Sequence, residues 1–542
     1  MAAMARPLDA RSRQFALVVL LFILVLASCA RLSNLIPVER GLLAWQDYDE
    51  GVWDTTAQLW LQGYLPYRDF FATLPPVGIY LLASVLRLVY VPWGSGLGLM
   101  ATRYASVLYG LATVALVYRL GRRLGGETTG LVAAGVLAVD AMVIGVDRLA
   151  MLEPPLNLFS VLAVSSYLSA FERGPGEREG RGWGAATGVL CALAALSKTP
   201  ALLVMFALVS ISLLRRRWQE VVVMAVGFAL AWTALSAPFL LRCPDQFLRQ
   251  VYFFQLLRPA DGVLNRMTRF YQIWHYAGAW TTVRLGVAGS LCVVLIAARR
   301  SEARGWWIVL AWAGYTLLLI VANRSYYPQY YVQLAVPLSL LAGGLCDTRI
   351  ASTLKALTTS VRLPRLAGAA GWLSLLAVTA IGVCSGALVR QYHDVVRLVT
   401  QTDSTYAQVA DALQQKSSSD ARVLAFEPNY TFLSSRRPAG EQATRFFVDS
   451  YGGMLYTNLG IESQALSQLM RGVLDSTRPE LQATFWRQPA QDAALASFER
   501  ADLVVLDGRA RYQLRPQTLS AIQAQSAQVF SFGVASVRRR EH

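Results

Sequence analysis

Charged residues are scarce in this chain. Asp, Glu, Lys and Arg together make up 15% of the 542 residues, whereas hydrophobic residues make up 55%. A soluble protein of this length needs far more polar surface, so the composition excludes an ordinary soluble enzyme and indicates a polytopic membrane protein. The chain has three histidines and six cysteines, which are scattered and show no metal-ligand spacing. A His/Cys metal site and a disulfide framework are therefore not expected.

The few charges are unevenly signed, since Lys and Arg number 50 and Asp and Glu number 34, a formal net charge of +16. In a soluble protein this excess would suggest nucleic acid as a partner. Here the arginines gather in short segments between apolar runs, which is typical of loops on the cytoplasmic side of a membrane. We therefore expect the lipid bilayer, and no nucleic acid, as a partner.

Apolar segments recur along the first 390 residues and predict about eleven spans, several of them shorter than the ~20 residues of a straight crossing. The first could also be a signal peptide, but we favour an uncleaved span because many spans follow. The predicted spans are 15–30, 100–120, 131–146, 154–171, 183–197, 201–214, 221–241, 279–298, 306–322, 330–346 and 367–389.

Alternating these spans places every arginine cluster on one side, provided that the apolar segment 72–91 does not cross. This segment opens with Pro75-Pro76 and carries Arg87. We interpret it as an interfacial or re-entrant helix; a true span is the alternative. The hairpin formed by 183–197 and 201–214 then turns outside the cytoplasm at Lys198, beneath the outer membrane surface.

From about residue 391 the chain becomes polar and mixed. We predict β-strands in 421–428, 445–451, 501–508 and 528–537, and helices in 405–416, 479–487 and 491–500. Alternating helices and strands predict a small α/β domain over 391–542. An odd number of spans places this domain outside the cytoplasm.

Most unusual polar residues fall in the loops of the same outer face. Ionisable groups at membrane depth are costly and usually face an interior or a water-filled cavity. For Asp54, Asp261 and Arg266 taken singly, we favour solvated loop positions. Lys198 could snorkel to the interface, and the tyrosines more often form an interfacial belt than a ligand contact. The group comprises Asp47, Asp49, Glu50 and Asp54, then Asp147, Arg148 and Glu153 (which could instead pair with one another), Lys198, Arg249, Arg258, Asp261, Arg266 and Arg269, and the segment 323–331 with Arg324, Tyr327 and Tyr330.

A carboxylate and several cations at a membrane face suit transfer of a sugar from a lipid phosphate. The carboxylate takes the proton of the attacking hydroxyl, and Arg and Lys stabilise the departing phosphate. Arginine is favoured for phosphate because its planar group binds two oxygens at once.

At this point the sequence resembles a known family. The stretch "DYDEGVWDTTAQLWLQGYLPYRDFFATLPPVGIYLLA" is similar to the first extracytoplasmic loop of the GT-C glycosyltransferases related to protein O-mannosyltransferases and lipid A aminoarabinose transferase. The matching elements are Asp49-Glu50, Gly63, Pro66-Tyr67 and Pro75-Pro76. The segment around Arg103 resembles the span that follows. Some relatives carry a lysine where this chain has Leu74, so phosphate contact there falls to other residues.

The resemblance implies a polytopic α-helical membrane protein of GT-C type, with about 11–13 transmembrane helices and a C-terminal extracytoplasmic α/β domain. Residues 1–390 would form the transmembrane catalytic domain, with 31–99 as its extracytoplasmic catalytic loop, and 391–542 the second domain. The implied location is the bacterial inner membrane, with the active site outside the cytoplasm. The implied partners are a polyprenyl-phosphate sugar donor and a glycan, lipid or protein acceptor.

In the family, the loop aspartate is the general base of an inverting transfer, and the match gives this role to Asp49, with Asp47 as the fallback. Glu50 and Asp147 would orient the acceptor or tune the base. No metal ligands are assigned, although some relatives need a divalent cation and two adjacent acids could bind one. The expected substrate-binding residues are Arg148, Glu153, Lys198, Arg103, Arg258, Arg324, Tyr327 and Tyr330.

Two other classes remain. A transporter or flippase of a lipid-linked substrate would also use buried charges, but such proteins usually show inverted repeats, and none is evident. A non-catalytic assembly partner would keep the fold without needing Asp49-Glu50.

Overall fold

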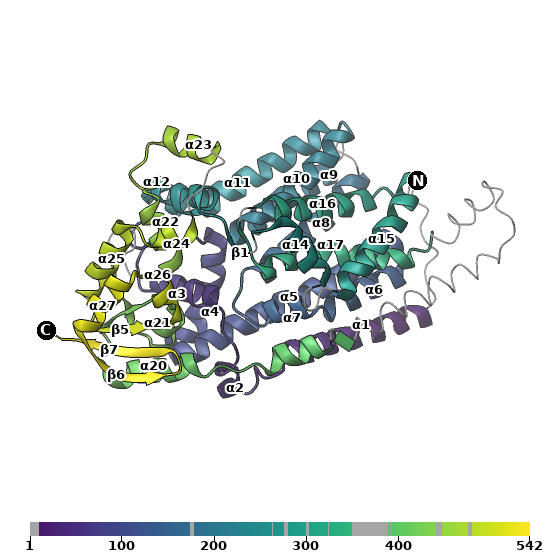
Figure 1. Ribbon diagram of the computed structural model, residues 1–542. Helices are drawn as coiled ribbons and strands as arrows, with labels where there is room; N and C mark the ends of the chain where they lie inside the picture. Colours follow the sequence, from purple (N-terminus) through teal and green to yellow (C-terminus); the bar gives the residue numbers. More distant parts are fainter. Residues whose placement is uncertain are drawn as a thin grey trace.

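The computed structural model describes residues 10–173, 178–262, 264–275, 280–299, 303–323, 325–349, 389–390, 392–440, 447–474 and 480–541. It consists of an elongated helix bundle with an α/β domain at one end (Figure 1). The predicted class, a helical membrane protein with a small α/β domain, is confirmed.

Every predicted span within the described residues coincides with a helix or a helix pair. Six helices among the described residues are long and apolar enough to cross a membrane, and five of them coincide with predicted spans. The number rises to seven if α6 (Glu127–Ala138) and α7 (Ala141–Asp147), bent by 66°, form one span. The predicted span 367–389 lies outside the described residues, apart from its last one. The other helices at predicted spans are α1 (Ala10–Leu32), α5 (Ser95–Gly125), α8 (Glu153–Arg173), α9 (Arg178–Ser197), α10 (Leu202–Leu214), α11 (Trp218–Arg242), α15 (Trp280–Arg299), α16 (Trp306–Ala322) and α17 (Tyr331–Gly343).

The segment 72–91 forms α4 (Pro76–Trp93), which starts at the second of the two prolines. Proline suits the first helical position because its missing N–H has no partner there in any case. Helix α4 is long and apolar enough to cross a membrane, so its interfacial placement stays a prediction. Gly94, at φ 91°, separates α4 from α5 and allows the chain to turn sharply there.

Small residues let the helices of the bundle approach closely. In α9, Gly188 lies against the backbone of α11, and a Cβ atom added to it would meet the Met224 carbonyl oxygen at 2.1 Å. In α11, Gly227 faces the Ala185 carbonyl in the same way. Without a hydrophobic driving force between helices in lipid, such close van der Waals packing holds spans together.

The α/β domain is built on a five-stranded sheet of order β4-β3-β5-β7-β6. Strands β4 (Arg437–Pro438), β3 (Arg422–Ala425) and β5 (Leu503–Leu506) are parallel, whereas β7 (Ala535–Arg540) and β6 (Ser526–Phe532) form an antiparallel hairpin. Strand β5 is buried along its whole length, as expected of a strand covered on both faces.

Most predicted elements of this domain are confirmed. Strands β3 and β5 lie within the predicted ranges 421–428 and 501–508, and the run 528–537 falls in the β6–β7 hairpin. Helices α20 (Thr405–Lys416) and α25 (Gln488–Phe498) lie at the predicted helices 405–416 and 491–500. The predicted helix 479–487 shortens to α24 (Leu481–Phe485).

The strand predicted at 445–451 is wrong over the described residues 447–451, and residues 445–446 lie outside the described part of the chain. Its C-terminal part begins a helix, α22 (Ser450–Asn458), because the Asp449 side chain accepts a hydrogen bond from Gly452 N and caps the first turn. A capping aspartate outweighs the β-favouring residues before it.

Loop 31–99 lies between the bundle and the α/β domain. Its helix α3 (Tyr48–Leu61) packs against α21 (Pro428–Ser434) of that domain, and the two lie side by side at the junction in Figure 1. At the start of α5, Ser95 Oγ donates to the carbonyl of Leu433 in α21 at 2.6 Å, a second contact between this segment and the C-terminal domain. The loop that carries the clustered acids is therefore covered by the C-terminal domain.

Candidate active site

The acids at the start of α3 have different tasks. Asp47 is the N-cap residue, and its side chain accepts from Asp49 N at 2.9 Å. Glu50 completes a capping box, since its side chain accepts from Asp47 N at 3.4 Å. Together they satisfy backbone donors that the first turn leaves unpaired. Asp54 is 0% exposed in the same helix and accepts from Thr102 Oγ1 at 3.0 Å, so its prediction as a solvated loop residue is wrong.

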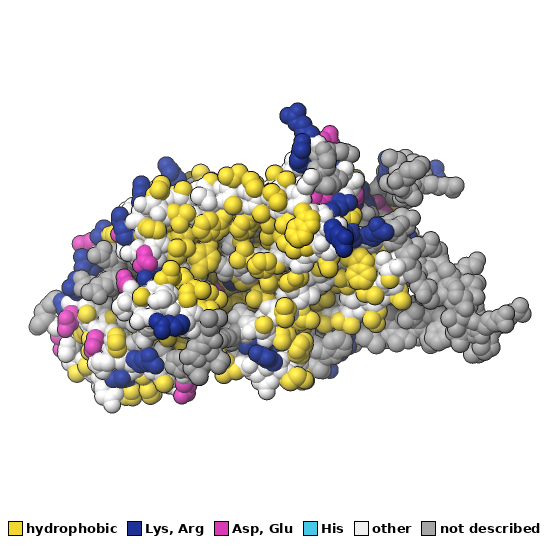
Figure 2. All heavy atoms as spheres, turned by 90° about the horizontal axis from the view of Figure 1, so that it is seen from above, with side chains coloured by type: hydrophobic (Ala, Val, Ile, Leu, Met, Phe, Trp, Pro, Cys, Tyr) yellow, Lys and Arg dark blue, Asp and Glu magenta, His cyan; other side chains and the backbone are white. Residues whose placement is uncertain are grey.

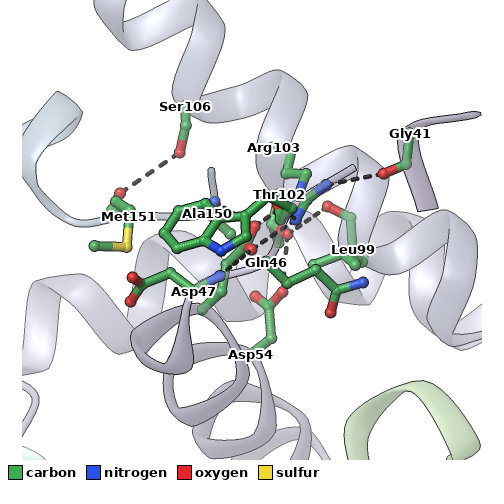
Figure 3. Close-up of polar contacts among 12 residues, drawn as sticks. Gly41, Gln46, Asp47, Asp54, Leu99, Thr102, Arg103, Ser106, Ala150 and Met151 are labelled. Atoms are coloured by element: carbon green, nitrogen blue, oxygen red, sulfur yellow. Dashed lines mark hydrogen bonds and ion pairs between the residues drawn. The ribbon is translucent and has the colours of Figure 1, made fainter. Parts of the chain in front are cut away.

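A fully buried ion pair joins Glu50 to Arg103 of α5. Arg103 Nε and Nη2 donate to the two Glu50 oxygens at 2.6 and 2.7 Å. Ala150 N donates to Glu50 Oε1 at 2.8 Å, and Arg103 Nη1 donates to the Gly41 carbonyl at 2.9 Å. Figure 3 shows Arg103 reaching from α5 to this junction, with Asp47, Asp54 and Ala150 around it. The ion pair fixes where α3 begins. The geometry therefore gives Glu50 and Arg103 a positioning role. Their predicted contacts with substrate stay predictions.

Asp49 differs from its neighbours because its carboxylate is uncommitted. The side chain is half-buried, and none of the described residues donates a hydrogen bond to it. Burial raises the pKa of Asp49 above its ordinary value, and Glu153 raises it further, while the positive charges of Lys198, Arg509 and Arg258 lower it. A free carboxylate held among cations, with a raised pKa, has the properties of a general base.

Lys198 lies in the turn after α9, as the sequence predicts. Its Nζ donates to Glu153 Oε1 at 2.5 Å and lies 5.4 Å from the centre of the Tyr330 ring. Burial lowers the pKa of Lys198, but Glu153, Tyr330 and Asp49 outweigh that effect and raise it overall. Lys198 therefore stays charged beside Asp49.

Arg258 and Asp261 form a second charged pair near the same place. Arg258 Nη2 lies 3.5 Å from Asp261 Oδ2, and the same oxygen accepts from the hydroxyls of Tyr327 and Tyr451. Burial lowers the pKa of Arg258, yet Tyr330 and the other neighbours raise it overall. The alternative in which Asp261 is a solvated loop residue is wrong, because its side chain is 12% exposed.

Asp147 and Arg148 hold α1 in place. Asp147 Oδ2 accepts from Arg31 Nε at 2.9 Å, and Arg148 Nη1 donates to the carbonyls of Ala30, Arg31 and Ser33 at 3.2, 3.0 and 2.5 Å. The alternative in which Asp147, Arg148 and Glu153 pair with one another is wrong. Their predicted roles toward substrate stay predictions, and Arg324 lies outside the described residues.

The C-terminal domain contributes residues that the sequence interpretation missed. Arg509 lies 3.9 Å over the Tyr48 ring and donates to Glu427 Oε2 at 2.9 Å. The Tyr48 hydroxyl donates to Asp449 Oδ1 at 3.0 Å. Burial raises the pKa of Glu427 to about 7, although the Arg509 guanidinium opposes the shift.

A signal for these residues was present in the sequence. Glu427 follows β3 and Arg509 follows β5, and these two strands are parallel neighbours. Polar residues after adjacent parallel strands meet at one edge of a sheet, where open α/β sheets bind ligands. Asn429, also after β3, donates to the Asp47 carbonyl at 2.9 Å and ties this edge to the acidic loop.

A cavity of about 430 Å³ lies beside Asp47 and is lined by Arg103 and Arg148 among mostly apolar residues.

The Asp49-Glu50 pair does not offer two free carboxylates to a metal ion. Both Glu50 oxygens accept hydrogen bonds from Arg103. Over the described ranges, no group of three or more His, Cys, Asp or Glu side chains could hold an ion.

Comparison with known proteins places this geometry in context. The family model described as dolichyl-phosphate-mannose-protein mannosyltransferase matches residues 47–242. The undecaprenyl phosphate-alpha-4-amino-4-deoxy-L-arabinose arabinosyl transferase of Edwardsiella ictaluri (strain 93-146) is 24% identical over 319 residues. That match covers 57% of each chain, so it spans a little over half the length of this relative.

Solved structures match over nearly the whole chain. ArnT from Cupriavidus metallidurans bound to undecaprenyl phosphate superposes with a TM-score of 0.59 at 17% identity, covering 96% of this chain and 97% of that one. The oligosaccharyltransferase AglB from Archaeoglobus fulgidus, in complex with an inhibitory peptide and a dolichol-phosphate, superposes with a TM-score of 0.58 at 11% identity, covering 96% and 73%. These matches confirm the predicted resemblance: the chain has the fold of the GT-C glycosyltransferases.

Proposed function

We propose that this multi-pass membrane protein is a glycosyltransferase that moves a sugar from a polyprenyl phosphate to an acceptor hydroxyl outside the cytoplasm, with inversion at the anomeric carbon. The observation that carries this proposal is Asp49, an uncommitted carboxylate whose pKa is affected by the positive charges of Lys198, Arg509 and Arg258. The match to the mannosyltransferase family model and to the arabinosyl transferase supports it. A solved structure of the same fold holds undecaprenyl phosphate.

In the proposed reaction, Asp49 takes the proton of the acceptor hydroxyl while the hydroxyl oxygen attacks the anomeric carbon. The bond from that carbon to the phosphate oxygen breaks on the opposite face, so the sugar inverts. The raised pKa of Asp49 makes it a stronger base than an ordinary aspartate.

The departing lipid phosphate gains negative charge, and in this proposal Lys198 and Arg258 stabilise it. Fixed cations in a site shielded from water stabilise such charge far better than mobile ions do. Glu153 and Asp261 hold these two cations in position through their ion pairs. Tyr330 lies beside Lys198 and is the proposed aromatic contact of the substrate site.

The proposed orientation puts Asp49 and the C-terminal domain outside the cytoplasm. It rests on the arginine distribution, which assigns the opposite end of the helices to the cytoplasmic side. For a bacterial chain the membrane would be the inner one.

The test is transfer by the purified protein in liposomes, supplied with a panel of polyprenyl-phosphate sugars and candidate glycan, lipid and protein acceptors. Asp49→Asn keeps the shape of the side chain but cannot accept the proton, so transfer should fall by about 10²–10⁴-fold. The matched control is Asp245→Asn, because the Asp245 side chain is 63% exposed and its pair with Arg249 contributes little.

Equal transfer by Asp49→Asn and the wild type would refute Asp49 as the base. Movement of the lipid-linked sugar across the bilayer with no transfer to any acceptor would favour the transporter class instead.

A further inference from the structure

A second cavity, of about 560 Å³, lies at the opposite end of the helix bundle from Asp49. Helix α8 connects the two places: Glu153 at its start pairs with Lys198, and Phe171 near its end lines the cavity. At 1.5 Å per residue these two side chains are about 27 Å apart along the helix. This length is close to the ~30 Å hydrocarbon thickness of a bilayer, so we expect the cavity at the other membrane interface.

Three arginines are among the residues that line this cavity: Arg215, Arg217 and Arg304. Arg217 Nη1 is satisfied, since it donates to Glu220 Oε1 at 2.6 Å and to the Phe171 carbonyl at 3.2 Å. Arg215 and Arg304 have no carboxylate within ion-pair distance among the described residues. Two positive charges at the cavity are therefore outside any ion pair within the described part of the chain.

Arg215 also has a donor without an acceptor. Its Nη2 donates to the Arg304 carbonyl at 3.3 Å, whereas its Nη1 is buried and has no hydrogen-bond partner. Buried donors are nearly always paired, and leaving one unpaired is unfavourable. Arg215 Nη1 therefore lacks a hydrogen-bond acceptor, which a bound ligand could supply.

The rest of the lining is aromatic and aliphatic. The guanidinium carbons of Arg215 and Arg217 lie 4.3 and 4.4 Å from the centre of the Phe171 ring, which holds both charges in place. Trp307 and Leu214 add apolar surface, and Leu214 is 81% exposed. In Figure 2, hydrophobic side chains cover the middle of one face and Lys and Arg side chains gather towards its ends, the arrangement of a membrane belt with charged borders.

We propose that this cavity binds the headgroup of an anionic glycerophospholipid, with its phosphate held by Arg215 and Arg304. The phosphate oxygens would accept from Arg215 Nη1, and the acyl chains would run along Leu214 and the neighbouring apolar belt. Basic cavities between helix ends recognise such headgroups, and arginine binds phosphate through paired hydrogen bonds. Inorganic phosphate shares the charge but cannot use the apolar part of the lining. This site is independent of Asp49 and of the proposed transfer reaction.

The experiment measures lipid retention by the full chain in a neutral detergent, using native mass spectrometry with phosphatidylglycerol or phosphatidylcholine added. Wild type should retain phosphatidylglycerol in preference. Arg215→Gln and Arg304→Gln should each lower its apparent affinity by about tenfold, the size expected for one charge-assisted contact. The matched control is Arg216→Gln, which removes the same charge from the same turn at an exposed residue outside the cavity lining. The control should retain the lipid as the wild type does.

Three results would overturn the assignment. One is equal retention of phosphatidylcholine, another is the same loss in Arg216→Gln as in Arg215→Gln, and the third is displacement of the lipid by inorganic phosphate at the same concentration, which would mark a small-anion site. Arg304 is exposed, so Arg304→Gln should fold and carries the test even if Arg215→Gln does not.

Discussion

In the variant Glu50→Gln, the Arg103 guanidinium would keep its charge but lose the carboxylate that neutralises it. Both side chains are 0% exposed. Removing one partner of a buried ion pair costs about 3–5 kcal/mol, because the remaining charge stays out of water. Arg103 still has the Gly41 and Trp45 carbonyls as acceptors, and the glutamine oxygen can still accept from Arg103. We therefore expect the lower end, about 3 kcal/mol of lost unfolding free energy.

The assay is unfolding by steric trapping or by sodium dodecyl sulfate in mixed micelles, run as a double-mutant cycle with Arg103→Met. The double variant buries no unpaired charge, so it should lose less than the two single variants combined, with a coupling energy of about 2 kcal/mol. Arg68→Gln is the control: the Arg68 side chain is 52% exposed in its pair with Asp69, and such surface pairs contribute about 1 kcal/mol or less.

Two results would refute this reasoning: a Glu50→Gln protein as stable as Arg68→Gln, or additive effects of the two partners. The same variant separates positioning from catalysis. If Glu50 only positions α3, transfer by Glu50→Gln should recover when the temperature is lowered enough to restore folding. A Glu50 that acts on substrate would leave transfer low at every temperature.

The remaining predictions concern helix packing and the base. Gly188→Ala would drive a Cβ atom into the backbone of α11 and should lower the unfolding free energy by about 1–3 kcal/mol. Gly314→Ala is the control, because no atom beyond its own stretch of helix lies within 4 Å of the new Cβ. It should be neutral or stabilising by up to about 1 kcal/mol. Equal changes of unfolding free energy in Gly188→Ala and Gly314→Ala would contradict the close packing of α9 on α11. Transfer should fall on acidification through the pKa of Asp49, which burial holds above the ordinary range, since only the ionised carboxylate accepts a proton. Arg509→Gln removes a charge that lowers this pKa, so the acidic limb of kcat/KM against pH should move to higher pH. Arg511→Gln, at an exposed residue of the same helix α26 (Gly508–Gln513), should leave the limb in place, and a limb that stays in place in both variants would contradict the proximity of Arg509 to the base.

The helices of the bundle could be predicted because lipid leaves the backbone few choices. An apolar segment in hydrocarbon must pair its own N–H and C=O groups, so a long apolar run is a helix almost by necessity. The strands after residue 420 were predicted for a similar reason, since short β-branched runs such as β5 fill a buried sheet. The strand prediction at 445–451 failed because Asp449 caps a helix there. A prediction from the β-favouring residues of the segment does not include this capping hydrogen bond.

The candidate site was predictable only in part. Asp49, Lys198 and Arg258 were selected as ionisable residues in outer loops, and the structure makes all three electrostatic neighbours. Asp261 was assigned to solvent, and Arg509 was not considered. The position of Arg509 after β5 was a signal in the sequence. Its approach to Asp49, like the burial of Asp261, depends on contacts between segments far apart in the chain.

The sequence by itself determined that this is a membrane protein with a helical bundle and a small α/β domain, and that "DYDE" is a chemically unusual loop. Only the tertiary structure decided how the acids of that loop divide their tasks. Glu50 is committed because Arg103, 53 residues away, reaches it, whereas Asp49 is left free among cations from three other parts of the chain. The physical reason is that charge pairing in a low-dielectric interior depends on distances of a few ångströms, and the fold alone sets those distances.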